Sequence, residues 1–260
     1  DFAGKKVLIR VDFNVPQDKD LKVTDNTRIT AAMPTITKVL QAGGTAVLMS
    51  HLGRPKGERQ DHMSLSHLVS EVEALSGAQV HFSSECVGDV AKAVVAQAGA
   101  GEIVLLENLR FHNEEEAGDE AFAKELAELG DIYLNDAFGT AHRAHASTAV
   151  IAQFFADENK GFGELMSAEV ESISKALGSD KGTTVAIIGG AKVSSKIGVI
   201  VNMLEKVGTV IIGGGMGFTF VKAMGGSVGT SLVEDDKLEL AKSLIEKAEA
   251  LGCNLLIPVD

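Results

Sequence analysis

Short apolar runs alternate with amphipathic segments along most of the chain. In the first part, the apolar runs predict strands at Lys6–Val11, Thr45–Ser50, Ala78–Phe82, Glu102–Leu106 and Asp131–Asn135. The segments between them repeat apolar residues every three to four positions, the spacing of a helix face. These segments predict helices at Arg28–Gln41, Ser64–Leu75, Val87–Gln97 and Asp119–Leu129. Such alternation is typical of a largely parallel sheet with helices on both faces.

A second series of alternating strands and helices is predicted after a polar, glycine-containing stretch at Ala156–Gly163. It opens with a predicted helix over Glu164–Leu177, which we interpret as a bridge between two α/β domains. Strands are then predicted at Thr183–Ile188, Thr209–Ile212 and Asn254–Val259, and helices at Val193–Val207, Met216–Met224 and Glu234–Leu251. We therefore expect one domain in residues 1–162, a connecting helix in 163–178 and a second domain in 179–260. With only three strands, that second domain is expected to be incomplete in this chain.

The arginines are confined to the predicted first domain. All six lie within the first 143 residues, and the chain from Ala144 onward contains lysine but no arginine. Four of them follow short apolar runs (Arg10, Arg54, Arg110 and Arg143), while Arg28 follows a polar turn. Open parallel sheets bind ligands outside the carboxyl ends of their strands. Because guanidinium groups present a planar fork to phosphate or carboxylate oxygens, the pattern predicts a site for a small polyanion.

The acidic net charge of the chain makes the local concentration of arginines more informative. The formal net charge is −12, which disfavours nucleic acid as a partner because binding to its backbone needs a basic surface. No apolar run reaches the roughly 18 residues of a membrane span, and the start of the chain lacks the apolar core of a secretion signal. Cys86 and Cys253 have no zinc or disulfide spacing and are expected to be buried thiols. We expect a cytoplasmic monomer with neither nucleic-acid nor membrane partners.

The motif RVDFNVP contains the first candidate binding residues. Alternation along a strand would place Arg10, Asp12 and Asn14 on one face. A cation, a carboxylate and an amide side by side would suit a hydroxy acid. The alternative is a structural Arg–Asp pair at the end of a strand.

Three further motifs follow predicted strands in the first domain. In SHLGRP, Gly53 allows close approach of the backbone, and His51 can donate to a phosphate or carboxylate. A capping or core histidine is the alternative there. ENLRFH places Arg110 just after its strand, and GTAHRAH sets two histidines around Arg143. Zinc at those histidines, His142 and His145, is an alternative hypothesis for which the sequence shows no nearby third ligand.

In the second domain, two glycine-rich segments lie between a strand and a helix. The glycines of GGAKVSSK, from Gly189, would expose backbone N–H groups at a helix N-terminus, where a phosphate fits. Lys192 and Lys196 are four residues apart and would share a helix face. A glycine turn with two surface lysines is the alternative. Gly213–Gly217 opens the next helix in the same way.

Known nucleotide and catalytic motifs are otherwise missing from the sequence. Neither glycine segment fits the dinucleotide pattern, and there is no P-loop. No Ser–His–Asp, Cys–His or paired-carboxylate arrangement stands out. Phosphoryl transfer between two anionic oxygens has no proton to remove, and it depends on positioning and on charge neutralisation by Arg, Lys and Mg²⁺. The sequence therefore predicts a kinase whose acceptor is not a hydroxyl group.

Seven motifs, in order along the chain, resemble the phosphoglycerate kinase family of glycolysis. They are RVDFNVP, TDNTRI, SHLGRPKG, LLENLRFH, NDAFGTAHRAHAS, GGAKVSSKI and IIGGGMGFTF. The resemblance implies two Rossmann-like three-layer domains joined by a hinge helix, one for 3-phosphoglycerate and the other for MgADP or MgATP. The implied reaction moves the acyl phosphate of 1,3-bisphosphoglycerate to ADP, reversibly.

The resemblance also implies roles for individual residues. Those expected to bind the glycerate or its phosphate are Asp12, Asn14, Arg28, His51, Leu52, Gly53, Arg54, Arg110 and Arg143, with Arg10 and His142 in the same basic patch. Those expected to meet the nucleotide phosphates or the moving phosphoryl group are Gly189, Gly190, Lys192 and Lys196, with Gly213 and Gly214 beside the adenine. Arg28, Lys192 and Lys196 are the implied catalytic residues.

The family pattern is not complete in this chain. Family members are longer, and their later part supplies a GGGDS-type or GGGDT-type loop whose aspartate holds the metal. That part also supplies a glutamate for the ribose and a C-terminal segment that returns to the first domain. We therefore assign no metal ligand here and expect Mg²⁺ to arrive with ADP or ATP. A second hypothesis is a non-catalytic module that captures a phosphorylated acid. A third, a nicotinamide dehydrogenase, is disfavoured by the defective glycine pattern.

Overall fold

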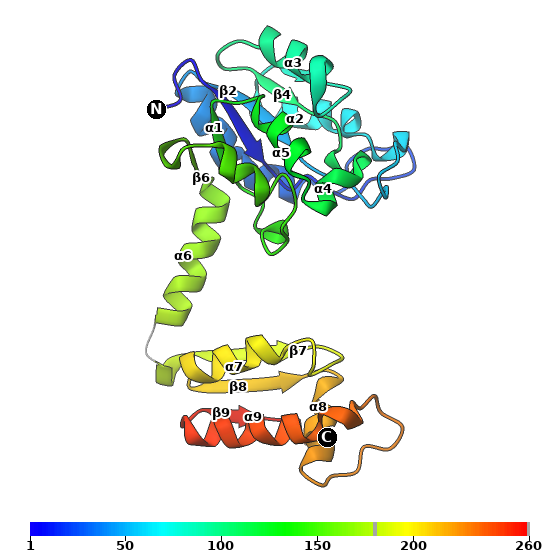
Figure 1. Ribbon diagram of the computed structural model, residues 1–260, viewed down its shortest axis with the longest axis vertical. Helices are drawn as coiled ribbons and strands as arrows, with labels where there is room; N and C mark the ends of the chain where they lie inside the picture. Colours follow the sequence, from blue (N-terminus) through cyan, green and yellow to red (C-terminus); the bar gives the residue numbers. More distant parts are fainter. Residues whose placement is uncertain (179–180, 259–260) are drawn as a thin grey trace. The chain divides into compact units, whose positions relative to one another are not determined.

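The computed structural model of the 260-residue chain describes residues 1–178 and 181–258 (Figure 1). It forms two compact units, Asp1–Val170 and Glu171–Asp260, each with its own parallel sheet. The division falls within α6 (Glu164–Gly178), and the domain bounds themselves stay a prediction. The predicted α/β class with mainly parallel sheets is confirmed.

The first unit has a six-stranded sheet in the order β3-β4-β2-β1-β5-β6, and all of its pairings are parallel. Its strands are β1 (Lys6–Arg10), β2 (Thr45–Met49), β3 (Val80–Phe82), β4 (Ile103–Leu105), β5 (Ile132–Asn135) and β6 (Lys160–Phe162). The first five lie within the predicted strands. The edge strand β6 was not predicted, because two of its three residues are exposed and it carries no apolar run.

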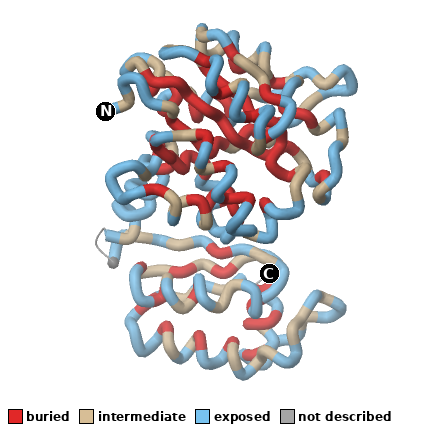
Figure 2. The backbone as a smooth tube through the Cα atoms, turned by 45° about the horizontal axis from the view of Figure 1, so that its top comes forward, coloured by how far each residue is buried: buried red, intermediate tan, exposed pale blue. Residues whose placement is uncertain are grey.

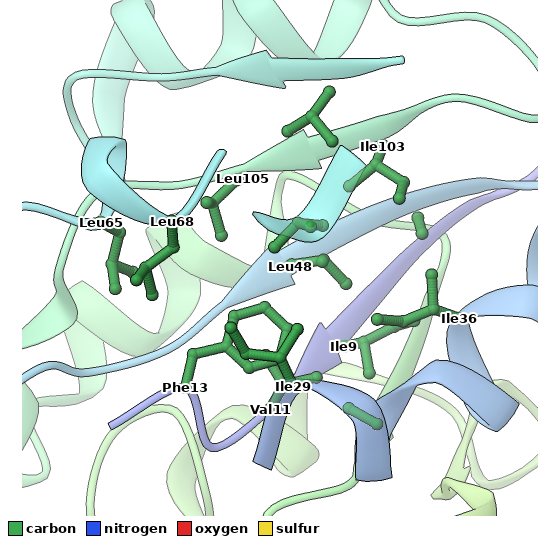
Figure 3. Close-up of a cluster of buried hydrophobic side chains, with 14 of the residues drawn as sticks. Ile9, Val11, Phe13, Ile29, Ile36, Leu48, Leu65, Leu68, Ile103 and Leu105 are labelled. Atoms are coloured by element: carbon green, nitrogen blue, oxygen red, sulfur yellow. The ribbon is translucent and has the colours of Figure 1, made fainter. Parts of the chain in front are cut away.

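Helices cover both faces of this sheet (Figure 1). They are α1 (Thr27–Gln41), α2 (Val69–Ser76), α3 (Gly88–Gln97), α4 (Asn113–Ala117) and α5 (Glu120–Ala127). Successive strand residues point to opposite faces, so Ile9 and Leu48 pack with α1 and α2, whereas Leu8 packs with α3 and α5. Figure 3 shows the first of these clusters, in which Phe13 lies beside the strands. Buried residues are accordingly concentrated in the central strands of the sheet (Figure 2).

The second unit has a three-stranded parallel sheet, β7 (Val185–Gly189), β8 (Thr209–Gly213) and β9 (Asn254–Leu256), in that order. Three helices, α7 (Ile197–Lys206), α8 (Met216–Ala223) and α9 (Leu238–Ala250), bury one face of it. On the other face Ile187 is 76% exposed. The unit is therefore partial within the described residues, as predicted. The last predicted strand ran to residue 259, which lies outside the described residues.

Cys86 and Cys253 are both buried thiols, as predicted. Within residues 1–178 and 181–258, no helix combines the length and the apolar character that a membrane crossing needs.

Candidate functional site

The candidate anion site of the first unit is built on neighbouring parallel strands that end at one edge of the sheet. Arg10 ends β1, His51 follows β2 by two residues, and a short 3-10 helix, Leu109–Phe111, carries Arg110 after β4. The segment with Arg143 follows β5. Residues from distant parts of the sequence thus meet where ligands of open parallel sheets bind. We call Arg10, Arg28, His51, Arg110 and Arg143 the basic cluster.

Arg28 reaches this edge from the first turn of α1. Its guanidinium Nη1 donates to Asp12 Oδ2 at 2.7 Å, and its side chain stays 51% exposed. Asp12 follows β1, so the ion pair fixes the arginine beside the strand end while leaving other N–H donors to solvent. Asp12 and Arg28, together with Phe138 and Gly139, line a cavity of about 240 Å³. This geometry leaves Arg28 able to bind a further anion.

The segment from His51 to Gly53 is held by three side chains from two other segments. Asn14 Oδ1 accepts the Gly53 N–H at 2.9 Å, and Arg110 Nη1 donates to the Gly53 carbonyl at 3.0 Å. Asn108 Nδ2 donates to the Leu52 carbonyl at 2.7 Å. Gly53 has a φ of +66°, which an L side chain rarely adopts. These hydrogen bonds and the positive φ of Gly53 therefore define the conformation of this backbone segment.

Arg10 lies in the interior of the unit, next to His51, and not at the surface. Its side chain is fully buried, and its guanidinium contacts Ser147 Oγ, the Val11 carbonyl and His51 Nδ1. The expectation that Arg10, Asp12 and Asn14 share a strand face is wrong, because β1 ends at Arg10 and the other two lie in the following loop. Arg10 is thus placed to support the basic cluster from within.

The remaining residues of the predicted set lie on the surface. Arg54, His142 and Arg143 are exposed, and Arg143 Nε contacts His142 Nε2 at 3.3 Å. Arg143 is close enough to Arg110 to lower the pKa of that guanidinium, although burial lowers it more. His145, the other histidine of the motif, is buried next to Glu115. No group of three or more His, Cys, Asp or Glu side chains able to hold a metal occurs among the described residues.

The pKa of His51 reflects the burial of its ring and the positive charges around it. Burial, together with the positive charges of Arg10, Arg110 and Arg28 and with His145, lowers the pKa of its imidazole to about 2, and burial is the largest of these causes. The ring is therefore neutral near pH 7. A region where several cations act on one buried ring has an excess of positive charge, which favours a polyanionic ligand.

This burial gives a pH dependence of stability. In the unfolded chain His51 takes up a proton below its ordinary pKa of 6.5, whereas in the folded chain it stays neutral down to about 2. Protons therefore favour the unfolded state, and stability falls as the pH drops below 6.5. His51→Gln should reduce the loss of unfolding free energy between pH 7 and pH 5 by about 2 kcal/mol.

Urea titrations followed by the fluorescence of Tyr133, the single tyrosine, would measure this loss. His62→Gln, at an exposed histidine of the same unit, is the matched control and should leave it unchanged. Equal pH dependence in wild type and His51→Gln would contradict the assignment.

In the second unit the two glycine-rich segments lie side by side at the ends of β7 and β8. Met216 N–H donates to the Gly190 carbonyl at 2.8 Å, and Gly190 N–H donates to the Gly213 carbonyl at 3.4 Å. Gly214 has a φ of +69°, and a Cβ there would lie 3.0 Å from the Gly190 oxygen. Only glycine permits this approach.

The two candidate phosphate-binding lysines of this unit, Lys192 and Lys196, are not placed as their spacing predicted. Helix α7 begins at Ile197, so Lys192 lies in the preceding loop and Lys196 at the N-cap position. They do not share a helix face, and Gly189 does not open α7. The loop is held instead by Glu234, whose carboxylate accepts from the Ser194 hydroxyl at 2.5 Å and from its N–H at 3.1 Å. By contrast, Gly213–Gly215 leads directly into α8, as predicted.

Sequence reasoning missed several residues that build the site. Asn108, Glu115, Ser147 and Glu234 are polar and contact the segments described above. The signal for Asn108 lay in its own motif, two residues before Arg110. The others contact residues 32 to 137 positions away, so no local pattern reveals them.

Comparison with known proteins gives a consistent result over the whole chain. The model of the phosphoglycerate kinase family matches residues 1–260. The chain is 53% identical to the phosphoglycerate kinase of Anaeromyxobacter dehalogenans (strain 2CP-C), over 100% of this chain and 66% of that protein. It is 52% identical to that of Chloroherpeton thalassium (strain ATCC 35110 / GB-78), over 100% of this chain and 64% of the relative.

A solved structure agrees with these matches. Phosphoglycerate kinase from Coxiella burnetii superposes with a TM-score of 0.84 at 37% identity, over 99% of this chain and 64% of that one. The chain thus spans just under two thirds of the length of these relatives. Both the sequence and the fold place it in the same group, and the chain belongs to the phosphoglycerate kinase family.

Proposed function

We propose that the basic cluster, with Asp12, Asn14 and the segment from His51 to Arg54, binds 3-phosphoglycerate. The observation that carries the proposal is the neutral, buried His51 acted on by three guanidinium groups, beside a backbone segment that Asn14 and Arg110 hold by hydrogen bonds. Guanidinium groups suit the phosphate and carboxylate at the two ends of this ligand. Asp12 and Asn14 supply a hydrogen-bond acceptor and an amide for the hydroxyl group that lies between the two ends of this ligand.

The proposed reaction transfers the acyl phosphate of 1,3-bisphosphoglycerate to ADP and gives 3-phosphoglycerate and ATP. Both the donor and the acceptor oxygens are anionic, so no general base is needed, and charge neutralisation carries the catalysis. Arg28 is the proposed catalytic residue of the first unit, because its guanidinium is anchored by Asp12 yet half exposed. Since the chain spans just under two thirds of its relatives, this activity is proposed for the full-length protein.

In the second unit, we propose that Gly189, Gly190, Lys192 and Lys196 meet the phosphates of ADP or ATP, with Gly213 and Gly214 beside the adenine. The closely packed glycine segments expose backbone there, and lysine contributes positive charge. Mg²⁺ would accompany the nucleotide and neutralise its phosphates. The described residues offer no cluster of ligands for the ion, so we assign it no protein ligand in this chain.

A binding module without catalysis is the second candidate for the 260-residue chain itself. It is favoured by the second unit, whose described part has three strands and one uncovered face of its sheet. Calorimetry with 3-phosphoglycerate and with MgADP, together with a coupled ATP assay, separates the candidates. The proposal expects binding of 3-phosphoglycerate by this chain and turnover by a full-length version. Binding without turnover in the full-length version would favour the module, and absence of binding would reject both.

A cytoplasmic, monomeric protein accompanies this proposal. The net charge of −12 and the two buried thiols support it. Light scattering of the purified protein would check the monomer.

Loss of Arg110 should weaken binding more than it slows turnover. Its guanidinium holds the Gly53 carbonyl and lies in the basic cluster. Arg110→Ala is expected to weaken 3-phosphoglycerate binding by about 1.5–3 kcal/mol, the range for a hydrogen bond to a charged group. Calorimetry would measure this change. An unchanged dissociation constant would remove Arg110 from the binding set.

A further inference from the structure

A row of buried polar side chains lies behind His51 in the first unit. Arg10, Ser147 and Glu115 have no exposed surface, and His51 is 4% exposed. Arg10 Nε donates to Ser147 Oγ at 2.8 Å, and that hydroxyl donates to Glu115 Oε1 at 2.6 Å. The Ser147 N–H donates to Glu115 Oε2 at 3.0 Å. At the other end of the row, Arg10 Nη2 lies 3.3 Å from His51 Nδ1.

The chemistry of these groups gives the row one direction. A guanidinium can only donate hydrogen bonds, and an ionised carboxylate can only accept them. Ser147 therefore accepts from Arg10 and donates to Glu115. At the opposite end, Nδ1 of His51 must accept from Arg10, so Nδ1 carries no proton. The proton of the neutral ring is then on Nε2, which has no hydrogen-bond partner among the described residues.

We propose that Glu115 and Ser147 are positioning residues that hold Arg10 against His51 Nδ1 and thereby keep His51 as the Nε2–H tautomer, which donates one hydrogen bond to an oxygen of an anionic ligand. A fixed tautomer matters because a neutral imidazole has only one donor, and the wrong tautomer would present a lone pair to the anion. The ligand part of this inference rests on the proposed function. The tautomer part does not.

The charged groups around His51 act in the same sense. Arg10 from β1, Arg28 from α1, Arg110 from the 3-10 helix and His145 from the segment after β5 each oppose protonation of the ring. Glu115, which lies on α4, partly offsets the positive charge of Arg10. The ring therefore remains neutral over the pH range in which the protein is handled, and its single proton is placed by the contact with Arg10.

Nitrogen-15 NMR of the histidine side chains tests the tautomer directly in the 260-residue chain without ligand. The His51→Gln spectrum assigns the His51 signals among the seven histidines. The proposal expects one proton-bearing ring nitrogen, Nε2, and an unprotonated Nδ1 in wild type at neutral pH. A protonated Nδ1, or a mixture of the two tautomers, would overturn it.

Variants test whether the buried row sets this state. Ser147→Ala should convert the His51 signals to those of a tautomer mixture. Tyr133→Phe is the matched control, because it removes an equally buried hydroxyl that contacts the Ser147 carbonyl at 2.9 Å without breaking the row. It should leave the His51 signals unchanged. Glu115→Gln tests the same row independently, so the result does not depend on folding of the serine variant. A wild-type tautomer in both row variants would reject the positioning role.

Affinity for 3-phosphoglycerate gives the second readout. Ser147→Ala should raise its dissociation constant about three- to tenfold, the loss of one ordinary hydrogen bond. Combined with His51→Gln, it should add little further loss, because the two changes remove the same contact. Full additivity would contradict action through His51. If wild type shows the expected tautomer but no binding of 3-phosphoglycerate, the proposed function fails and the buried row stands.

Discussion

Replacing Arg28 with alanine in a full-length version of the protein is expected to lower turnover at least ~100-fold, which is in line with the effect of arginines on transferring phosphoryl groups. Arg28 combines two properties that the other cluster arginines do not combine. It is anchored by an ion pair with Asp12 at 2.7 Å, and it keeps half of its side chain accessible. Alanine would remove the charge and leave Asp12 without its cation.

Steady-state kinetics with saturating substrates would measure this effect, because a loss confined to transition-state interactions lowers kcat. Lys19→Ala is the control, since that lysine is an exposed cation of the same unit and lies outside the basic cluster. It should keep near wild-type turnover. A kcat for Arg28→Ala within a few-fold of wild type would remove Arg28 from its catalytic role.

Removal of the Glu115 carboxylate should cause the largest loss of stability in the first unit. Glu115 and Arg10 are both fully buried and linked through Ser147. Truncating one partner of a buried charge pair leaves the other uncompensated, which costs about 3–5 kcal/mol. Glu115→Ala is therefore expected to lower the unfolding free energy of this unit by about that amount.

Urea unfolding followed by Tyr133 fluorescence isolates the first unit, because the chain has one tyrosine and no tryptophan. Glu114→Ala, at the exposed neighbouring position of α4, should change the unfolding free energy by less than about 0.5 kcal/mol. A similarly small change for Glu115→Ala would show that the Glu115 carboxylate does not stabilise the folded state through its link to Arg10.

The regular elements of the first unit could be predicted because burial on both faces of a parallel sheet leaves a continuous apolar run in each strand. Leu8 and Ile9 illustrate this, since adjacent residues enter opposite cores. The strand β6 could not be found this way, because an edge strand needs only backbone pairing, and Gly161 and Phe162 are exposed.

The candidate site was predictable only in part. The motifs identified candidate residues at the strand ends and glycine turns, since both are marked locally. They did not show that Arg10 is buried or that Lys192 precedes its helix, because both depend on contacts with distant segments. Ser147 lies 137 residues from Arg10, and Glu234 lies 40 residues from Ser194. Tertiary structure alone brings such partners together.

Folding brings separate arginines and His51 together at the proposed anion site. A titration of the isotope-labelled chain with 3-phosphoglycerate would follow the side-chain nitrogen signals of Arg28, Arg54, Arg110, Arg143 and His51. We expect these signals to shift together with a single dissociation constant, while those of Arg59 stay in place. Signals that do not move, or that follow different dissociation constants, would contradict this expectation.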